Sequence, residues 1–356
     1  MEQYKLSVAS SPHASSPVGT KNLMRDVLIA LIPAMVMGVW VFGPRALTMT
    51  LVSVVFCEIF EWGYCKLMHK PIPISDLSAA ITGVLLVFVC PVTLPYWMII
   101  IGDFFAIVIV KQLFGGLGTN FLNPALAGRA FLMLSYPVPM TTWVLPGKEN
   151  WASIGSAADA VTGATPLSID YMKSAEDAGA AISQFSMGDM FIGNIGGCVG
   201  EVSAIALLIG GIYLIAKKVI RIRIPAAYIL TVAVLTLILS RAPEGANVFE
   251  WMLREIFAGG LFLGAFFMAT DYVTSPNTPK GEIIFGIGAG LLVVFIRYFG
   301  GYPEGVCYSI LVMNICVWLI DKYTLPKRFG VTAEMRKAEK EKAKAAKKAA
   351  KEGAEA

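Results

Sequence analysis

The feature that most constrains this chain is a series of long apolar stretches that charge seldom interrupts. Val27 to Phe42 and Met98 to Val110 are two examples. Such stretches approach the roughly 20 residues that an α-helix needs to cross a bilayer. Only 15% of the 356 residues are charged, whereas a soluble domain usually carries about 25%. The pattern excludes an ordinary globular core and predicts an all-α polytopic membrane protein embedded in a lipid bilayer.

Apolar runs between charged, Pro and Gly residues predict about ten transmembrane helices. Several are short for a hydrocarbon core of about 30 Å and contain Gly, which indicates tilted or broken helices buried among their neighbours. Residues 1–22 lack the features of a cleaved signal peptide. The ten helices are expected near residues 24–41, 46–65, 77–90, 97–113, 122–136, 202–216, 226–239, 256–269, 283–297 and 306–320.

The two halves of the chain resemble each other. Phe114-Gly115-Gly116 recurs as Phe299-Gly300-Gly301, with apolar runs on both sides of each copy. Five helices per half is an odd number, so the second repeat is expected to be inverted, as in membrane proteins that enclose a midplane site. Chance recurrence of F-G-G in a Gly-rich chain is the alternative.

The distribution of Lys and Arg predicts the orientation, because cations favour the cytoplasmic side. Both termini are expected to be cytoplasmic, although Arg45, Arg241 and Arg254 go against the bias. The predicted regions are a cytoplasmic N-terminal segment (1–22), a first five-helix membrane repeat (23–136), an extracytoplasmic loop region (137–200), a second five-helix repeat (201–325) and a basic cytoplasmic tail (326–356). We expect a multi-pass protein of the cell (inner) membrane.

One motif in the loop region carries chemistry. Residues 159–165 read D-A-V-T-G-A-T, which matches the pattern D-x-x-[ST]-G-A-T of flavin transferases that split FAD and attach FMN to a threonine hydroxyl. Thr165 would supply the oxygen, Gly163 and Ala164 would leave room for the transferase, and Asp159 and Thr162 complete the pattern. A turn capped by Asp and Thr is the alternative, but it does not require the fixed Asp and both threonines.

The chain resembles the family of D subunits of the Rnf ion-translocating ferredoxin:NAD oxidoreductase, which is similar to the B subunit of the sodium-translocating NADH:quinone reductase. The resemblance rests on residues 10–17, 111–131, 159–165 and 299–314. It implies FMN on Thr165 at the outer face, a noncovalent riboflavin between helices, and electron relay coupled to Na⁺ or H⁺ translocation. The implied partners are a flavin transferase and the other subunits of the complex, including a second covalent-FMN subunit and iron–sulfur subunits.

Charged residues inside predicted helices are candidates for function because each is costly unless paired or hydrated. Asp103 is the main candidate for an ion path. Arg129, Glu58 and Glu61 are further candidates, and a structural ion pair or an interfacial position explains each of these charges equally well.

Other polar and sulfur-containing residues favour structural roles. Asn120 and Asn123 are expected to hydrogen-bond a broken helix. The six cysteines lack metal-ligand spacing and are interpreted as packing residues. The two histidines, His13 and His69, lie in polar flanks, which excludes paired axial haem ligands within the membrane. The sequence predicts no metal ligand, no catalytic side chain and no nucleic-acid partner.

Two other classes of function stay open. A secondary transporter or channel would explain the inverted repeats, but it leaves the D-A-V-T-G-A-T segment without a role. A redox-inactive scaffold subunit would carry the same segment unmodified.

Overall fold

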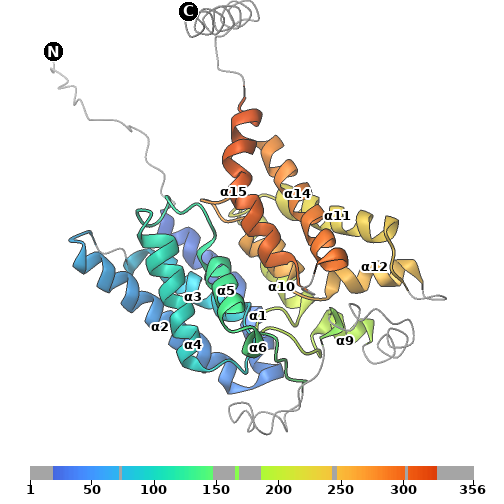
Figure 1. The fold of residues 1–356 in the computed structure, drawn as a ribbon, viewed down its shortest axis with the longest axis horizontal. Helices are drawn as coiled ribbons and strands as arrows, with labels where there is room; N and C mark the ends of the chain where they lie inside the picture. Colours follow the sequence, from blue (N-terminus) through green and yellow to red (C-terminus); the bar gives the residue numbers. More distant parts are fainter. Residues whose placement is uncertain are drawn as a thin grey trace, which may run out of the picture.

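The computed structural model describes residues 19–71, 74–146, 165–167, 186–242, 247–300 and 304–326. Their secondary structure is helical, with connecting turns (Figure 1). The helices α1–α6 gather on one side of the molecule and α10–α15 on the other. The basic tail, the N-terminal segment and most of the predicted loop region lie outside the described residues.

The first half begins with two long helices, α1 (Thr20–Phe42) and α2 (Pro44–Leu67), joined at Gly43. After the short 3₁₀ turn η1 (Ile74–Asp76) come α3 (Ser78–Phe88), α4 (Tyr96–Phe104), the π-helix η2 (Phe105–Gln112), α5 (Pro124–Ser135) and α6 (Pro137–Met140). Every residue of α3 is buried. The five predicted helices of this half are therefore present, and the fourth changes from α to π geometry halfway along.

The second half begins with α9 (Met187–Ile192), α10 (Ala204–Ala216) and α11 (Arg223–Ile238). The next element is bent: α12 (Val248–Phe257) is followed by α13 (Leu261–Leu263) and the π-helix η4 (Gly264–Met268), at an angle of 61°. Two long helices, α14 (Pro279–Phe299) and α15 (Val306–Thr324), complete the half.

The prediction of one helix over residues 256–269 was wrong in its start. The helix begins at Val248 and breaks after Phe257. Hydropathy missed α12 because it carries Arg254 and Glu255, yet both side chains are buried. Arg297 of α14 explains part of this, since its guanidinium Nη1 lies 3.0 Å from Glu255 Oε2.

Segments from the second half satisfy backbone groups of the first. The carbonyls of Phe88 and Cys90, at the end of α3, accept the N–H groups of Gly200 and Val199. The amide of Asn123 caps α5 and also donates to the Met268 carbonyl at the end of η4, at 3.3 Å. This confirms the predicted role of Asn123, and broken helices can lie within the bundle because their free backbone groups find such partners.

Length and composition identify four described helices that could cross a membrane: α1, α2, α14 and α15. The bent pair α12 and α13–η4 makes a fifth, and α3, α10 and α11 are shorter apolar helices. Large apolar side chains on the long helices point outward, including Trp40, Leu51 and Trp318. The protein is therefore a multi-pass helical membrane protein.

Two of the three arginines that oppose the charge bias, Arg45 and Arg241, have local partners. Arg45 donates to the carbonyls of Val92 and Leu94 and lies over the ring of Tyr96. Arg241 lies 4.8 Å from the ring centroid of Tyr298. These contacts give a physical reason for cations at positions that the bias does not favour.

Candidate functional site

Thr165 is buried at the edge of the helix bundle, with 6% of its surface exposed. The next two residues form a short helical turn, and Leu167, which is 4% exposed, belongs to the hydrophobic core. Attachment of FMN was expected to need a segment that leaves room for the transferase, whereas Thr165 and Leu167 are both buried in this structure. Asp159, Thr162, Gly163 and Ala164 lie outside the described residues.

Thr165 lines a small cavity at the junction of several segments. Pro166, Ile195 and Val202 form the apolar part of its wall, and two further sets of residues complete it. Glycines expose their backbone at Gly196, Gly197 and Gly259, and carboxylates come from Glu201 and Glu304. A cavity lined by a hydroxyl, glycine backbone and carboxylates can accept a compact polar group.

The break between α12 and α13 provides part of this cavity. Gly259 has a φ of +69°, and a Cβ there would come within 3.2 Å of Leu167 and 3.4 Å of the Arg297 guanidinium. A Cβ on Gly260 would lie 2.4 Å from a carboxylate oxygen of Glu201. The two glycines are therefore needed, one for its left-handed backbone and one for close approach.

A buried cluster of charges lies behind the cavity. The Arg129 guanidinium on α5 pairs with Glu304, just before α15. The functional atoms of Cys198, Glu201 and Glu304 lie within 4.8 Å of one another. Glu201 is 5% exposed, and its Oε2 atom has no hydrogen-bond partner among the described residues. The structural alternative for Arg129, an ion pair inside the bundle, is thus confirmed.

Asp103 lies far from Thr165 in the sequence and in a different polar cluster. Its Oδ1 atom accepts from Ser53 at 2.6 Å and from the Cys57 thiol at 3.3 Å, while Oδ2 has no partner among the described residues. Glu61, one turn beyond Cys57 on α2, forms a buried ion pair of 2.7 Å with Lys111. The structural alternative is therefore confirmed for Glu61. Asp103 is fully buried, and its place in an ion path stays a prediction.

A larger cavity lies between the two halves. Its wall contains Lys111, Asn120 and Asn123 from the first half, and Phe266, Phe267 and Asp271 from the second. The lining is mostly apolar with a few polar groups, which is the usual character of a small-molecule site. Both π-helices contribute to it, and π-helical turns are frequent at functional sites.

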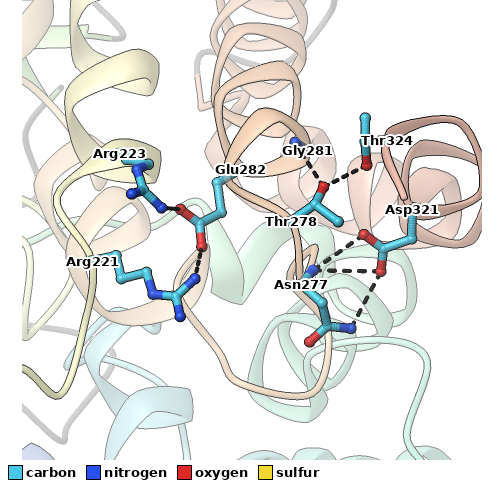
Figure 2. A network of polar contacts seen from close by, with 8 residues as sticks. All are labelled: Arg221, Arg223, Asn277, Thr278, Gly281, Glu282, Asp321 and Thr324. Atoms are coloured by element: carbon cyan, nitrogen blue, oxygen red, sulfur yellow. Dashed lines mark hydrogen bonds and ion pairs between the residues drawn. The ribbon is translucent and has the colours of Figure 1, made fainter. Parts of the chain in front are cut away.

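A polar network ties α14 to its neighbours at its N-terminal end (Figure 2). Glu282 pairs with Arg221 at 2.7 Å and with Arg223 at 3.0 Å. Asp321 on α15 accepts from the backbone and side chain of Asn277. This network joins three helices of the second half and lies apart from the cavity at Thr165.

Glu201, Glu304 and Gly259 line the cavity at Thr165 but were not predicted from the sequence. Glu304 lies 175 positions from Arg129, so no local pattern connects them. The available signal was weak: each acidic residue follows or precedes a glycine in a loop between apolar helices. The cysteine interpretation is confirmed for the five that are buried, and Cys316 is partly exposed.

The bundle and the cavity define a multi-pass helical membrane protein with a buried threonine at a glycine-walled site. The chain belongs to the NQR2, RnfD, RnfE family, whose model matches residues 7–330. This confirms the resemblance seen in the sequence.

Curated relatives cover almost the whole chain. The D subunit of the Na⁺-translocating ferredoxin:NAD⁺ oxidoreductase complex of Acetobacterium woodii is 46% identical over 335 residues, covering 93% of this chain and 98% of that relative. The D subunit of the proton-translocating ferredoxin:NAD⁺ oxidoreductase complex of Clostridium ljungdahlii is 46% identical over 330 residues, covering 91% and 96%. The D subunit of an ion-translocating oxidoreductase complex of Citrobacter koseri is 37% identical over 350 residues, covering 91% and 98%.

Proposed function

We propose that the chain is the membrane flavoprotein subunit of a redox-driven ion pump, and that it carries FMN on Thr165. The observation that carries the proposal is the position of this threonine. It ends the D-A-V-T-G-A-T segment and lines a cavity walled by glycine backbone. In the transfer, the Thr165 oxygen bonds to the phosphorus of FAD that bears the riboflavin portion, AMP leaves, and the hydroxyl loses its proton.

The cavity is about 10 Å³, close to the space of one water molecule, so it would have to widen to admit a phosphoryl group. Gly196, Gly197 and Gly259 lack side chains where a tethered phosphate would approach, and glycine permits such close approach of the backbone to a ligand. Leu167 and Pro166 fix the backbone of Thr165 against the core. When bound, a flavin accepts two electrons and releases them singly, so the chain has to position it between donors and acceptors.

The ten-helix inverted repeat belongs to the same proposal, and helix packing supports it. In the first half α2 packs on α3 and α4, and in the second half α11 packs on α12 and α14. Across the two halves, α1 packs on α10 and α5 packs on α15. This pattern is expected when a two-fold axis relates the first five helices to the last five.

The proposed orientation places Thr165 outside the cell, with both termini inside. In a ferredoxin:NAD oxidoreductase the soluble electron donors and acceptors are cytoplasmic. Electrons that reach Thr165 would therefore cross the bilayer and return, through iron–sulfur and flavin groups of partner subunits. The names of the two relatives with 46% identity give different ions, Na⁺ and H⁺. Measuring electron transfer in vesicles with and without sodium would show which ion this chain's complex is coupled to.

We also propose roles for the cavity between the two halves and for Asp103. The cavity between the halves is the candidate site for a noncovalent riboflavin, because Asn120 and Asn123 offer hydrogen bonds beside the aromatic rings of Phe266 and Phe267. Asp103 is the candidate for an ion path, because its second carboxylate oxygen is buried without a partner among the described residues.

The test is flavin fluorescence of the denatured protein on a gel. Coexpression with a flavin transferase is expected to give a fluorescent band in the wild type and none in Thr165→Ala. Thr141→Ala is the matched control, since Thr141 is exposed and its hydroxyl bonds only within its own turn. Fluorescence that persists in Thr165→Ala would refute the assignment, and a dark wild-type band would favour a transporter or a scaffold.

A further inference from the structure

A polar cavity lies beside the network shown in Figure 2, at the end of the bundle where α14 begins and α15 ends. Its volume is about 250 Å³. Lys218 and Arg221 in its wall are cationic and exposed, so the cavity opens to the surface. Hydroxyl groups line it at Thr270, Tyr272 and Ser275. Cations and hydroxyl groups can both donate hydrogen bonds to an anion.

Positive charge is in excess at this cavity. Glu282 is 4% exposed, and its two carboxylate oxygens contact Arg221 at 2.7 Å and Arg223 at 3.0 Å. Lys218 takes part in none of the ion pairs among the described residues. One carboxylate therefore stands against three cations.

Two other acids lie near this end of the bundle but do not line the cavity. The Asp271 carboxylate accepts from the Thr274 hydroxyl at 3.0 Å and lines the cavity between the two halves. Asp321 accepts from the backbone and side chain of Asn277. The cations of the polar cavity therefore remain available to an anion.

Both arginines keep donors for a ligand. A guanidinium carries five N–H donors, and the contact of each arginine with Glu282 uses the Nη1 nitrogen. The side chains of Arg221 and Arg223 are 65% and 43% exposed. Guanidinium groups bind phosphate oxygens through paired hydrogen bonds, so a phosphate group suits this set of donors.

The position of the cavity relative to the membrane follows from α14. This helix is long and apolar enough to cross a bilayer, and Glu282 lies in its first turn. Ile283, Ile284 and Ile287, which follow, are exposed, and Ile222 between the two arginines is 59% exposed. Outward-facing apolar side chains thus begin directly beside the cations, at the level of the lipid headgroups. Basic pockets between membrane helices at this level bind anionic headgroups.

We propose that this cavity binds the headgroup of an anionic phospholipid. The phosphate lies at Lys218 and Arg221, and the acyl chains lie on the exposed isoleucines of α14. A soluble phosphate compound would use the cations alone, whereas a phospholipid uses both the cations and the neighbouring apolar surface. The inference goes beyond the proposed function and does not depend on FMN at Thr165.

Glu282 has the opposite role to the cations in this proposal. Its carboxylate competes with the lipid phosphate for Arg221 and Arg223. Loss of a cation should therefore weaken lipid binding, and loss of the Glu282 charge should strengthen it. A purely structural network would not give these opposite signs.

Photocrosslinking in nanodiscs tests the proposal on the full-length protein. Phosphatidylglycerol, which is anionic, and phosphatidylcholine, which is zwitterionic, each carry the same diazirine in the acyl chain near the glycerol, so their headgroups are unmodified. Each photoreactive lipid is present at the same small fraction in a phosphatidylcholine nanodisc, and labelling is mapped by mass spectrometry to Ile222 and residues 283–287. We expect phosphatidylglycerol to label these residues more strongly than phosphatidylcholine in the wild type.

Three variants assign this selectivity to the cavity. Lys218→Gly removes a cation without backbone strain, because Lys218 has a φ of +59°, which glycine adopts freely. One cation near the membrane surface is worth about fivefold in affinity for anionic lipid, so the ratio of the two labelling yields should fall about fivefold. Glu282→Gln should raise the ratio. Lys66→Gln is the matched control and should leave it unchanged, because Lys66 is exposed on α2 and does not line the cavity.

Three results would overturn the proposal. Equal labelling by the two lipids in the wild type would do so, even where Lys218→Gly fails to fold. A ratio that survives in Lys218→Gly, or that falls in Glu282→Gln, would also do so. Soluble glycerol phosphate that abolishes the labelling at the concentration of the lipid would assign the cavity to a free phosphate compound and overturn the lipid assignment.

Discussion

Removing Arg129 should destabilise the protein strongly. The Arg129 side chain is 4% exposed, and the side chain of its partner Glu304 is 10% exposed. Arg129→Met keeps an apolar stem but leaves Glu304 buried without its cation. Breaking a buried pair in this way costs about 3–5 kcal/mol, which is more than about a hundredfold in the folding equilibrium.

A double-mutant cycle separates the pair from simple loss of packing. Glu304→Gln in the Arg129→Met chain removes the stranded charge, so the double variant should be more stable than the sum of the single changes predicts. Contacting residues usually show coupling of about 0.5–3 kcal/mol, and a largely buried pair is expected toward the upper end. Measuring the variants in the Thr165→Ala chain removes any contribution from an attached flavin.

The assay is unfolding in detergent micelles, followed by tryptophan fluorescence. Arg241→Gln is the matched control, since Arg241 is exposed and stacks on the ring of Tyr298, a contact of about 0.5–1 kcal/mol. A cost below about 1 kcal/mol for Arg129→Met, or strict additivity in the cycle, would refute the reasoning that this pair is buried and isolated from water.

Three further changes test other parts of the structure. Gly259→Ala forces a side chain into a left-handed backbone beside Leu167, so thermal unfolding in detergent should show a loss of about 1–2 kcal/mol. Gly197→Ala should be nearly neutral, because its Cβ meets one atom at an ordinary 3.8 Å; equal losses in the two variants would contradict this. Asn123→Ala removes the cap of α5 and should cost about 0.5–2 kcal/mol in the same measurement, and an unchanged melting curve would show that the cap is not needed. Glu282→Gln removes the ion pairs with Arg221 and Arg223, whose side chains are 65% and 43% exposed. The loss in unfolding free energy should stay below about 1 kcal/mol and shrink with added salt. A large loss that does not depend on salt would contradict solvent screening of these pairs.

Features that depend on neighbouring residues could be predicted from the sequence. The apolar lengths of α1, α2, α14 and α15 indicated membrane helices, and Asn123 was expected to hydrogen-bond a broken helix, as its contact with Met268 confirms. These predictions succeed because length, hydropathy and capping are local properties of the chain. The motif ending at Thr165 is local in the same sense.

Features that depend on long-range packing could not be predicted from the sequence. Arg254 and Glu255 lower the hydropathy of the stretch before the bend at Gly259, yet both are buried in the folded chain. The contact of Arg129 with Glu304 joins the two halves. A charge in an apolar stretch shows that a partner is needed, but it does not show which of several acids supplies it.

The burial of Thr165 also constrains the order of events in the proposed function. The cavity is built from the loop before α10, the break after α12 and the turn before α15, so it is complete only when the helices of the second half have packed. A threonine that is 6% exposed leaves a separate transferase no room to reach its hydroxyl. In the proposed function, Thr165 is therefore expected to receive FMN before Leu167 packs into the core.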